Sequence, residues 1–295
     1  MYGAEEPFSP IPECGKRESF VELDILEVWS DPRFVAVAIG TPVIATVAFL
    51  AFSVPYSWLM TREWPWLEQY RIQGTRARER ARWSASLRLL AGNGILGAAV
   101  LALGWPLLAL TGLHLGPLPG PFEIIVQLFV FALIEDFCFY WAHRALHTPW
   151  LYRHVHELHH RETAPWGLWG NHLHPAEYLV ISSLVLVGPL LIGSHIVTLW
   201  IFVAFRQWES AESHSGFDFP WNPANLIPLF DGALYHDFHH RRFIGNYAGM
   251  FSYLDRIFGT YSRGYVKARA QSSGWIGFKR RALLALARPR SLRSS

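Results

Sequence analysis

Histidine is the residue type whose number and spacing could do chemistry in this chain. Of its 14 histidines, 13 lie between His143 and His240. Eight of them form three short clusters, one with the spacing His-x-x-x-His and two with the spacing His-x-x-His-His. The members are His143 and His147; His156, His159 and His160; and His236, His239 and His240. Imidazole nitrogen is a ligand for iron, zinc, copper and nickel, so these clusters predict metal binding.

The spacing within the clusters indicates how many ions they could hold. Side chains three and four positions apart share one face of a helix, whereas adjacent side chains diverge. A His-x-x-His-His cluster on a helix can therefore reach two ions that lie close together. Catalytic zinc needs three protein ligands and a water molecule, and eight imidazoles exceed that number. We therefore expect a two-metal site, although the ligand type does not select the metal and a water-activating zinc site stays open.

The remaining histidines differ in their surroundings. His174 precedes Pro175, and His214 follows the last apolar segment, so we expect both as further metal ligands. Whether His172 is a metal ligand stays open, and His154 is a weaker candidate because it faces away from His156 on a helix. His114 and His195 lie beside turns in apolar sequence, and we expect structural roles for them.

Ligand histidines usually donate their second N–H group to a carboxylate or a carbonyl, which fixes the tautomer. Three acids are the candidates for this supporting role. Asp237 lies inside the third cluster, Asp136 lies seven residues before His143, and Glu177 follows His174 closely.

The composition indicates what kind of fold must position these residues. Hydrophobic residues make up 51% of the 295 residues and charged residues 17%, against about 25% charged in soluble domains. Four apolar segments approach or exceed the roughly 20 residues that a spanning helix needs. They are residues 34–60, 89–116, 124–142 and 178–205, of which the last fits one tilted helix or a hairpin broken near Gly193. We therefore predict an all-α polytopic membrane protein with about four transmembrane helices and a helical cap that carries the two-metal site.

The charges between the apolar segments predict the orientation. Residues 61–83 contain six arginines, whereas residues 117–121 contain no charge. The positive-inside rule places the arginine loop in the cytoplasm, and the histidine clusters then lie on the same side. The N-terminus falls outside, unless the first segment is a re-entrant hairpin broken at Pro42 or Pro55.

We divide the chain into four regions: a polar segment (1–33), a transmembrane region with the arginine loop (34–120), a catalytic domain (121–265) and a basic tail (266–295). From Arg256 onward there are ten Lys or Arg residues and no acid. Such a tail suits an anionic membrane surface or a solvated basic end. No nucleic-acid-binding motif accompanies it, so we expect no nucleic-acid partner. The two cysteines do not form the paired motif of an iron–sulfur or zinc-finger site.

The sequence around the clusters resembles a known superfamily. The stretch Thr163-Ala164-Pro165-Trp166-Gly167 follows the second cluster, and His174-Pro175-Ala176-Glu177 and His214-Ser215-Gly216 come next. Gly245-Asn246-Tyr247 and Asp255-Arg256-Ile257-Phe258-Gly259-Thr260 follow the third cluster. With the three histidine clusters, this series resembles the fatty acid hydroxylase/sterol desaturase superfamily, and within it the C-4 methylsterol oxidase branch.

The resemblance implies a membrane-bound non-haem di-iron monooxygenase that oxidises a C4 methyl group of a sterol with O2. It implies an electron donor such as cytochrome b5 or a reductase or ferredoxin, and a location in the endoplasmic reticulum of a eukaryote or the inner membrane of a bacterium. Its metal ligands correspond here to the eight clustered histidines with His174 and His214. Zinc can replace iron in such nitrogen sites on purification. Oxidation of another lipid by the same superfamily, and a membrane zinc hydrolase, are the alternatives.

Overall fold

The computed structural model of the protein describes residues 25–74 and 83–272, and within these ranges it contains helices and no strand. The longer helices are α3 (Thr41–Met60), α6 (Trp83–Leu103), α8 (Pro121–Leu146), α11 (Pro175–Ile192), α12 (Ile196–Ser213), α13 (Ala233–Arg242) and α15 (Arg263–Gln271). The shorter helices are α1 (Ile25–Ser30), α2 (Pro32–Phe34), η1 (Val35–Gly40), α4 (Pro65–Glu68), α7 (Trp105–Leu108), α9 (Pro149–Leu151), η2 (Tyr152–His156), α10 (Glu157–His160), η3 (Gly167–Asn171), η4 (Pro223–Asn225) and α14 (Tyr253–Ile257). The all-α prediction is confirmed.

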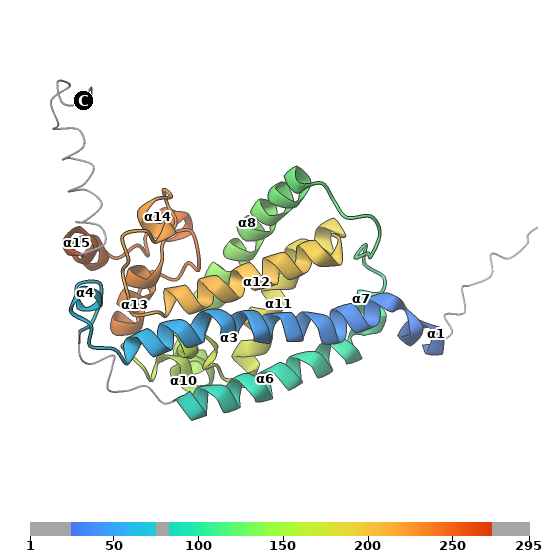
Figure 1. The fold of residues 1–295 in the computed structure, drawn as a ribbon, viewed down its shortest axis with the longest axis horizontal. Coiled ribbons are helices and arrows are strands. Elements are labelled where there is room, and N and C mark those ends of the chain that lie inside the picture. The colour runs from blue at the N-terminus through green and yellow to red at the C-terminus, as the bar shows by residue number, and fades with distance from the viewer. Residues whose placement is uncertain (1–24, 75–82, 273–295) are drawn as a thin grey trace, which may run out of the picture.

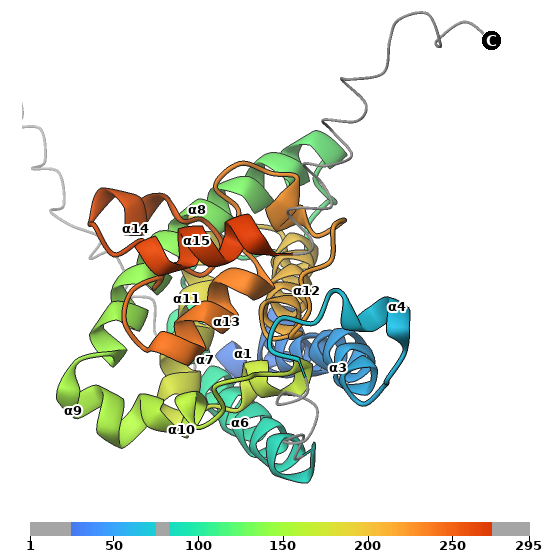
Figure 2. The same ribbon diagram turned by 90° about the vertical axis from the view of Figure 1, so that its left-hand side faces the viewer.

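The long helices form a bundle with a cap at one end. In Figure 1, α3, α6 and α12 run along the long axis of the molecule, α11 lies largely behind α3 and α12, and α4, α10, α13, α14 and α15 gather at the left-hand end. Figure 2, viewed from that end, shows α13 and α15 in front of the bundle. The cap contains the second and third histidine clusters, and the first cluster lies at the end of α8. The bundle therefore brings the three clusters to one end of the molecule.

The last apolar segment forms a hairpin, which is one of the two predicted alternatives. α11 begins at the cap residue His174, whose Nδ1 accepts a hydrogen bond from the Ala176 amide. It ends at Gly193, which has a left-handed backbone (φ 66°) and lies so close to Gly112 that a Cβ would come within 2.9 Å of the Gly112 Cα. Only glycine fits such a position, so the chain reverses there and α12 begins.

A buried apolar core holds the bundle together. α12 packs along α3, and α11 packs against α8. Phe131, Val185, Phe202 and Trp105 are among the buried residues of this core. Many apolar residues instead point outward, including Ile95, Leu103 and Ile125. Contiguous exposed apolar surface on such helices is expected where lipid replaces water.

Within residues 25–74 and 83–272, three helices are long and apolar enough to cross a membrane: Pro32–Met60, Trp83–Leu103 and Pro175–Ile192. The first runs through Pro42 and Pro55 without reversing, so the re-entrant alternative is wrong. The predicted count of four is not confirmed. The third predicted segment lies in α8, where the buried Glu135 and Asp136 interrupt the apolar sequence.

Some predicted features lie outside the described residues. These are most of the polar N-terminal segment, the arginines at positions 76, 78, 80 and 82, and the basic tail from residue 273 onward.

Candidate metal centre

Three separate stretches of the chain supply the clustered histidines. His143 lies in the last turn of α8 and His147 follows that helix directly. The second cluster spans the wider turn η2 and the short helix α10, and the third lies on α13. The predicted helical spacing is therefore observed in all three clusters.

Nine histidines converge into two groups. What we call the first group contains His143, His147, His156, His160 and His239, and the second group contains His159, His214, His236 and His240. Within each group the ligand nitrogens lie within 4.8 Å of one another. Eight of the nine side chains are buried, and His147 is half-buried. Each His-x-x-His-His cluster contributes to both groups, as its diverging side chains predict.

The Nε2 atoms are in close contact within each group. In the first group, His239, His147, His156 and His160 form a closed ring of Nε2···Nε2 distances of 3.0–3.2 Å. In the second group the Nε2 atoms form an open chain, from His159 through His214 and His236 to His240. Successive Nε2 atoms in this chain are 3.0–3.3 Å apart.

The opposite nitrogen of several rings is already engaged as a donor. His143 Nδ1 donates to the Tyr247 carbonyl at 2.7 Å, and His239 Nδ1 donates to the Gly245 carbonyl at 2.9 Å. His156 Nδ1 donates to the Glu177 carboxylate at 2.7 Å. Two second-group rings are held in the same way, His214 by the Ser210 carbonyl and His240 by the Glu162 carbonyl. These bonds fix the tautomer, so each of these Nε2 atoms carries a lone pair.

Burial keeps the imidazoles of the cap neutral. Removal from water lowers the pKa of five histidines well below its ordinary value, and the neighbouring imidazoles lower it further. They are His159, His160, His236, His239 and His240. A metal ligand must be the neutral form, so these rings are ready to bind a cation.

The arrangement fits two metal ions on physical grounds. Lone pairs that face one another at about 3 Å repel unless a proton or a cation lies between them. Two nitrogens that bind one ion at about 2.0–2.1 Å lie about 2.9–3.4 Å apart. The observed Nε2···Nε2 distances fall in that range in both groups. The two groups therefore suit one divalent ion each, in an all-imidazole environment.

Two of the histidines singled out in the sequence lie outside both groups. His174, predicted as a ligand, instead caps α11 through its Nδ1, because a side-chain acceptor before Pro175 satisfies the free amide of Ala176. His172 stacks on Trp169 with ring centroids 3.7 Å apart, and its Nδ1 lies 3.0 Å from Ser86 Oγ. His214, the other additional candidate, lies in the second group.

The remaining single histidines have local partners. His154 is exposed and its Nδ1 donates to the Trp150 carbonyl. His195 caps α12, and His114 lies beside it with ring centroids 5.2 Å apart. Both belong to the turns at the end of the bundle opposite the cap, which agrees with the structural roles expected for them.

The three predicted supporting acids have different positions. Glu177 contacts a histidine of the first group directly. Asp136 instead accepts hydrogen bonds from the Met250 and Phe251 amides at 2.8 and 3.2 Å, so it holds the loop after α13. Asp237 points away from both groups to Gln73 Nε2 at 2.9 Å, and burial raises its pKa to about 7.

The sequence reasoning missed the backbone carbonyls that hold His143 and His239. Gly245 and Asn246 both have positive φ angles (79° and 57°), which turn the Gly245 and Tyr247 carbonyls toward the two rings. Asp255 fixes this loop by accepting hydrogen bonds from the Tyr247 and Ala248 amides. The Gly-Asn pair after the third cluster was the available signal, since these residue types favour left-handed backbone.

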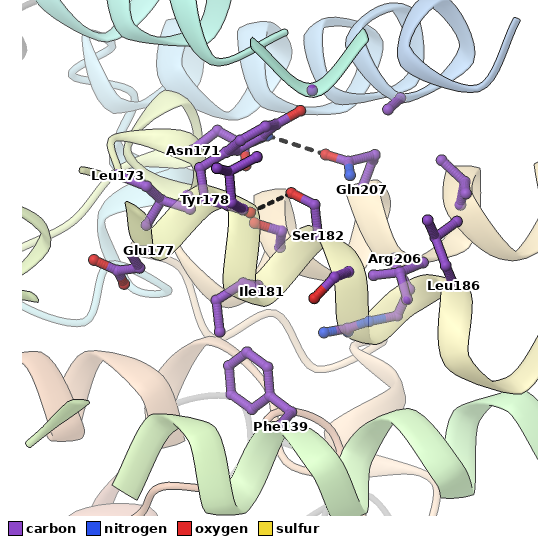
Figure 3. Close-up of a pocket in the computed structure, with 18 of the residues that line it drawn as sticks. Phe139, Asn171, Leu173, Glu177, Tyr178, Ile181, Ser182, Leu186, Arg206 and Gln207 are labelled. Carbon is purple, nitrogen blue, oxygen red and sulfur yellow. Dashed lines mark hydrogen bonds between the residues drawn. The ribbon is translucent and has the colours of Figure 1, made fainter. Parts of the chain in front are cut away.

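A cavity of about 390 Å³ leads from the histidines into the bundle. His143, His156, His159, His214 and His236 line its inner end. Its walls come from α3, α6, α8, α11 and α12 and are mostly apolar. Figure 3 shows Phe139 of α8 pointing toward Ile181 of α11, with Tyr178 and Ser182 on the side of α11 away from Phe139. The volume and the apolar lining suit a small lipid-like molecule.

Comparison with known proteins decides the family. Residues 128–260 match the family model described as fatty acid hydroxylase. Methylsterol monooxygenase 2-1 of Arabidopsis thaliana is 36% identical over 253 residues, which cover 80% of this chain and 92% of the plant protein. The chain belongs to the fatty acid hydroxylase family. The resemblance read from the sequence is thus confirmed.

Two further relatives match this chain over different lengths. A putative methylsterol monooxygenase of Dictyostelium discoideum is 35% identical, covering 79% of this chain and 87% of that protein. A very-long-chain aldehyde decarbonylase of Oryza sativa subsp. indica is 44% identical over a shorter stretch, covering 62% of this chain and 70% of that protein. No solved structure matches the chain significantly. Membership makes the protein a membrane oxidoreductase with histidine groups that can hold metal.

Proposed function

We propose that this protein is an iron-dependent monooxygenase that oxidises a C4 methyl group of a membrane sterol. The observation that carries the proposal is the convergence of nine imidazoles, in two groups, at the closed end of an apolar cavity. The methylsterol monooxygenase relatives, which align over most of their length, support the choice of substrate.

We infer that the nine converging histidines hold two iron ions, one in each group. His174 is not part of this set, since its ring caps α11. Bound iron would supply the activation of O2 that attack on an unactivated C–H bond requires. In the overall reaction, the methyl group and O2 with two electrons and two protons give the alcohol and one water molecule. Zinc would occupy the same nitrogens when it is more available than iron.

The chain's own residues would orient the metal ligands, bind the lipid and exclude water. Glu177 and the carbonyls of Gly245 and Tyr247 hold ligand rings in one orientation, which is how surrounding groups tune a metal site. The apolar walls would hold a flat lipid so that one methyl group reaches the histidines. They also keep bulk water from the reacting carbon, which limits side reactions.

The electrons must come from outside the chain. We propose a one-electron carrier such as cytochrome b5, or a reductase or ferredoxin, that docks on the cap. The half-buried His147 brings the first group nearest to that surface. By the positive-inside argument the cap faces the cytoplasm, in the endoplasmic reticulum membrane of a eukaryote or the inner membrane of a bacterium.

The test is turnover by the purified protein in lipid nanodiscs, loaded anaerobically with ferrous iron and supplied with a chemical or protein reductant. We expect consumption of O2 and conversion of a 4-methylsterol to its 4-hydroxymethyl product. Metal analysis accompanies the assay. Hydrolytic activity with zinc and no O2 uptake would instead favour a membrane zinc hydrolase.

Oxidation of another lipid is the second candidate. The specific observation in its favour is the 44% identity with the rice aldehyde decarbonylase, which exceeds the identity with the methylsterol monooxygenases. Long-chain aldehydes and fatty acyl lipids therefore belong in the same assay. Turnover of these substrates alone would contradict the sterol proposal and support this one.

A further inference from the structure

The cavity has one open side. Of the described residues that line it, three are exposed: Val100 of α6, Leu107 of α7 and Ser183 of α11. Val100 and Leu107 are 44% and 74% exposed, whereas the five lining histidines are all buried. The cavity is therefore closed at its histidine end and open between α6–α7 and α11.

The opening lies well away from the cap. Ser183 follows Glu177, which contacts a first-group histidine, by six residues on α11, a rise of about 9 Å along the helix. Val100 and Leu107 lie at the end of α6 and on α7, at the end of the bundle opposite the cap (Figure 1). A molecule that extends from the histidines to the opening must therefore be elongated.

The surface around the opening is apolar. Leu103 and Leu110 are 79% and 70% exposed beside Leu107. α6 and α11 are two of the three helices that can span a membrane. When α6 and α11 span a membrane, this apolar surface would face hydrocarbon rather than water.

On the cap side of the opening, α6 and α11 approach closely. A Cβ on Gly97 would lie 3.1 Å from the Tyr178 hydroxyl, so the tyrosine rests against the α6 backbone. Tyr178 also lines the cavity (Figure 3). Gly97 and Tyr178 therefore line the cavity on the cap side of the opening.

We propose that a lipid substrate enters and leaves this protein sideways, from the bilayer, through the opening bordered by Val100, Leu107 and Ser183. The molecule enters with its reacting end first and keeps its apolar tail at the opening. The proposal rests on the proposed lipid oxidation for its substrate. It identifies α6–α7 and α11 as the portal, and the cap surface as a region that the substrate does not cross.

Bulky substitutions test the portal. Ser183→Trp and Val100→Trp place a large ring at the opening, and each is expected to lower kcat/KM for a bilayer-delivered 4-methylsterol about tenfold or more. The matched controls are Val180→Trp on α11 and Ile95→Trp on α6, which are exposed but do not line the cavity. We expect their kcat/KM to change less than about twofold. Metal content and thermal stability should be equal in all four variants.

Photolabelling tests the portal independently of turnover. A diazirine-bearing sterol in phosphatidylcholine vesicles should label peptides that contain Val100, Leu107 or Ser183 in the parent protein, and excess unlabelled 4-methylsterol should suppress the labelling. Labelling confined to the cap, or equal kcat/KM in portal and control variants, would overturn the proposal. The parent protein could also be labelled at the portal, with suppression by unlabelled 4-methylsterol, and yet not oxidise the sterol. That result would support the portal and contradict the proposed reaction.

Discussion

Individual side chains around the histidine groups have separable roles. Some nitrogen atoms face the proposed ions, and others are used for capping or for orienting a ring. The two functions predict different consequences when a single residue is changed, although the residue types are the same.

His214 and His174 provide the sharpest comparison. His214→Ala removes one of four nitrogens from the second group, and we expect the protein to lose at least one metal ion per chain. His174→Asn keeps a side-chain acceptor for the Ala176 amide, since asparagine is a good helix cap, and should retain both ions. Elemental analysis of the two purified variants checks this. Equal metal loss in both would show that His174 is a ligand after all.

Glu177 orients His156 without facing the proposed ion. Glu177→Leu removes the acceptor for His156 Nδ1 and should weaken metal binding about 10- to 100-fold, the usual effect of losing such a partner. Glu157→Leu, in the same cluster but exposed, is the control. Metal retention against a competing chelator is the measurement. Unchanged retention in the Glu177 variant would rule out the supporting role.

At the scale of elements, the loop after α13 is as important as the clusters themselves. Its left-handed turn at Gly245 aims carbonyl groups at two ligand rings from different helices. The loop thereby couples the end of α8 to α13, and Asp255 holds it in place.

Gly245→Ala should damage both folding and metal binding. A Cβ there would lie 2.6 Å from the Thr260 carbonyl oxygen, at a φ of 79°. We expect a loss of about 1–3 kcal/mol in the free energy of unfolding, together with reduced metal content. Gly259→Ala is the matched control, because its φ is 69° but no atom lies within 4 Å of the added Cβ. It should cost about 1 kcal/mol and leave the metal content intact, as thermal denaturation and metal analysis would show. Equal metal content in both variants would contradict the role of the loop.

Much of the element arrangement was predictable from sequence, and the reasons differ between elements. Cluster spacing predicted which histidines could share a helix face, and the glycine at position 193 left a hairpin as one of two predicted forms. The predicted count of four spanning helices is not confirmed, and the segment in question is α8, where two buried acids lie in apolar sequence. The capping role of His174 could not be predicted, because a histidine before a proline has the same pattern whether it binds metal or caps a helix. The carbonyl partners of the rings were missed because every residue has a carbonyl group, and only the Gly245-Asn246 pair marks the turn that aims them.

At the scale of the whole molecule, the metal site joins segments that are far apart in sequence. The first group takes histidines from α8, η2, α10 and α13, and the second adds the end of α12. A cation in each group would therefore tie the bundle to the cap, which makes metal binding part of the folding free energy.

Metal removal should destabilise the entire cap. A ligand that binds only the folded state at a thousandfold excess over its Kd stabilises that state by about 4 kcal/mol. We therefore expect a chelator to lower the Tm of the detergent-solubilised protein and ferrous iron to restore it. The Tm of the His214→Ala variant should change less on addition of chelator or ferrous iron. A Tm that is independent of chelator in the parent protein would argue against metal in these groups.

The most direct measurement is a structure of the protein purified without chelator and loaded anaerobically with ferrous iron, with the iron located by anomalous scattering. We expect two iron peaks, one surrounded by the Nε2 atoms of His143, His147, His156, His160 and His239, and the other by those of His159, His214, His236 and His240. A single peak, or iron bound elsewhere in the chain, would contradict it.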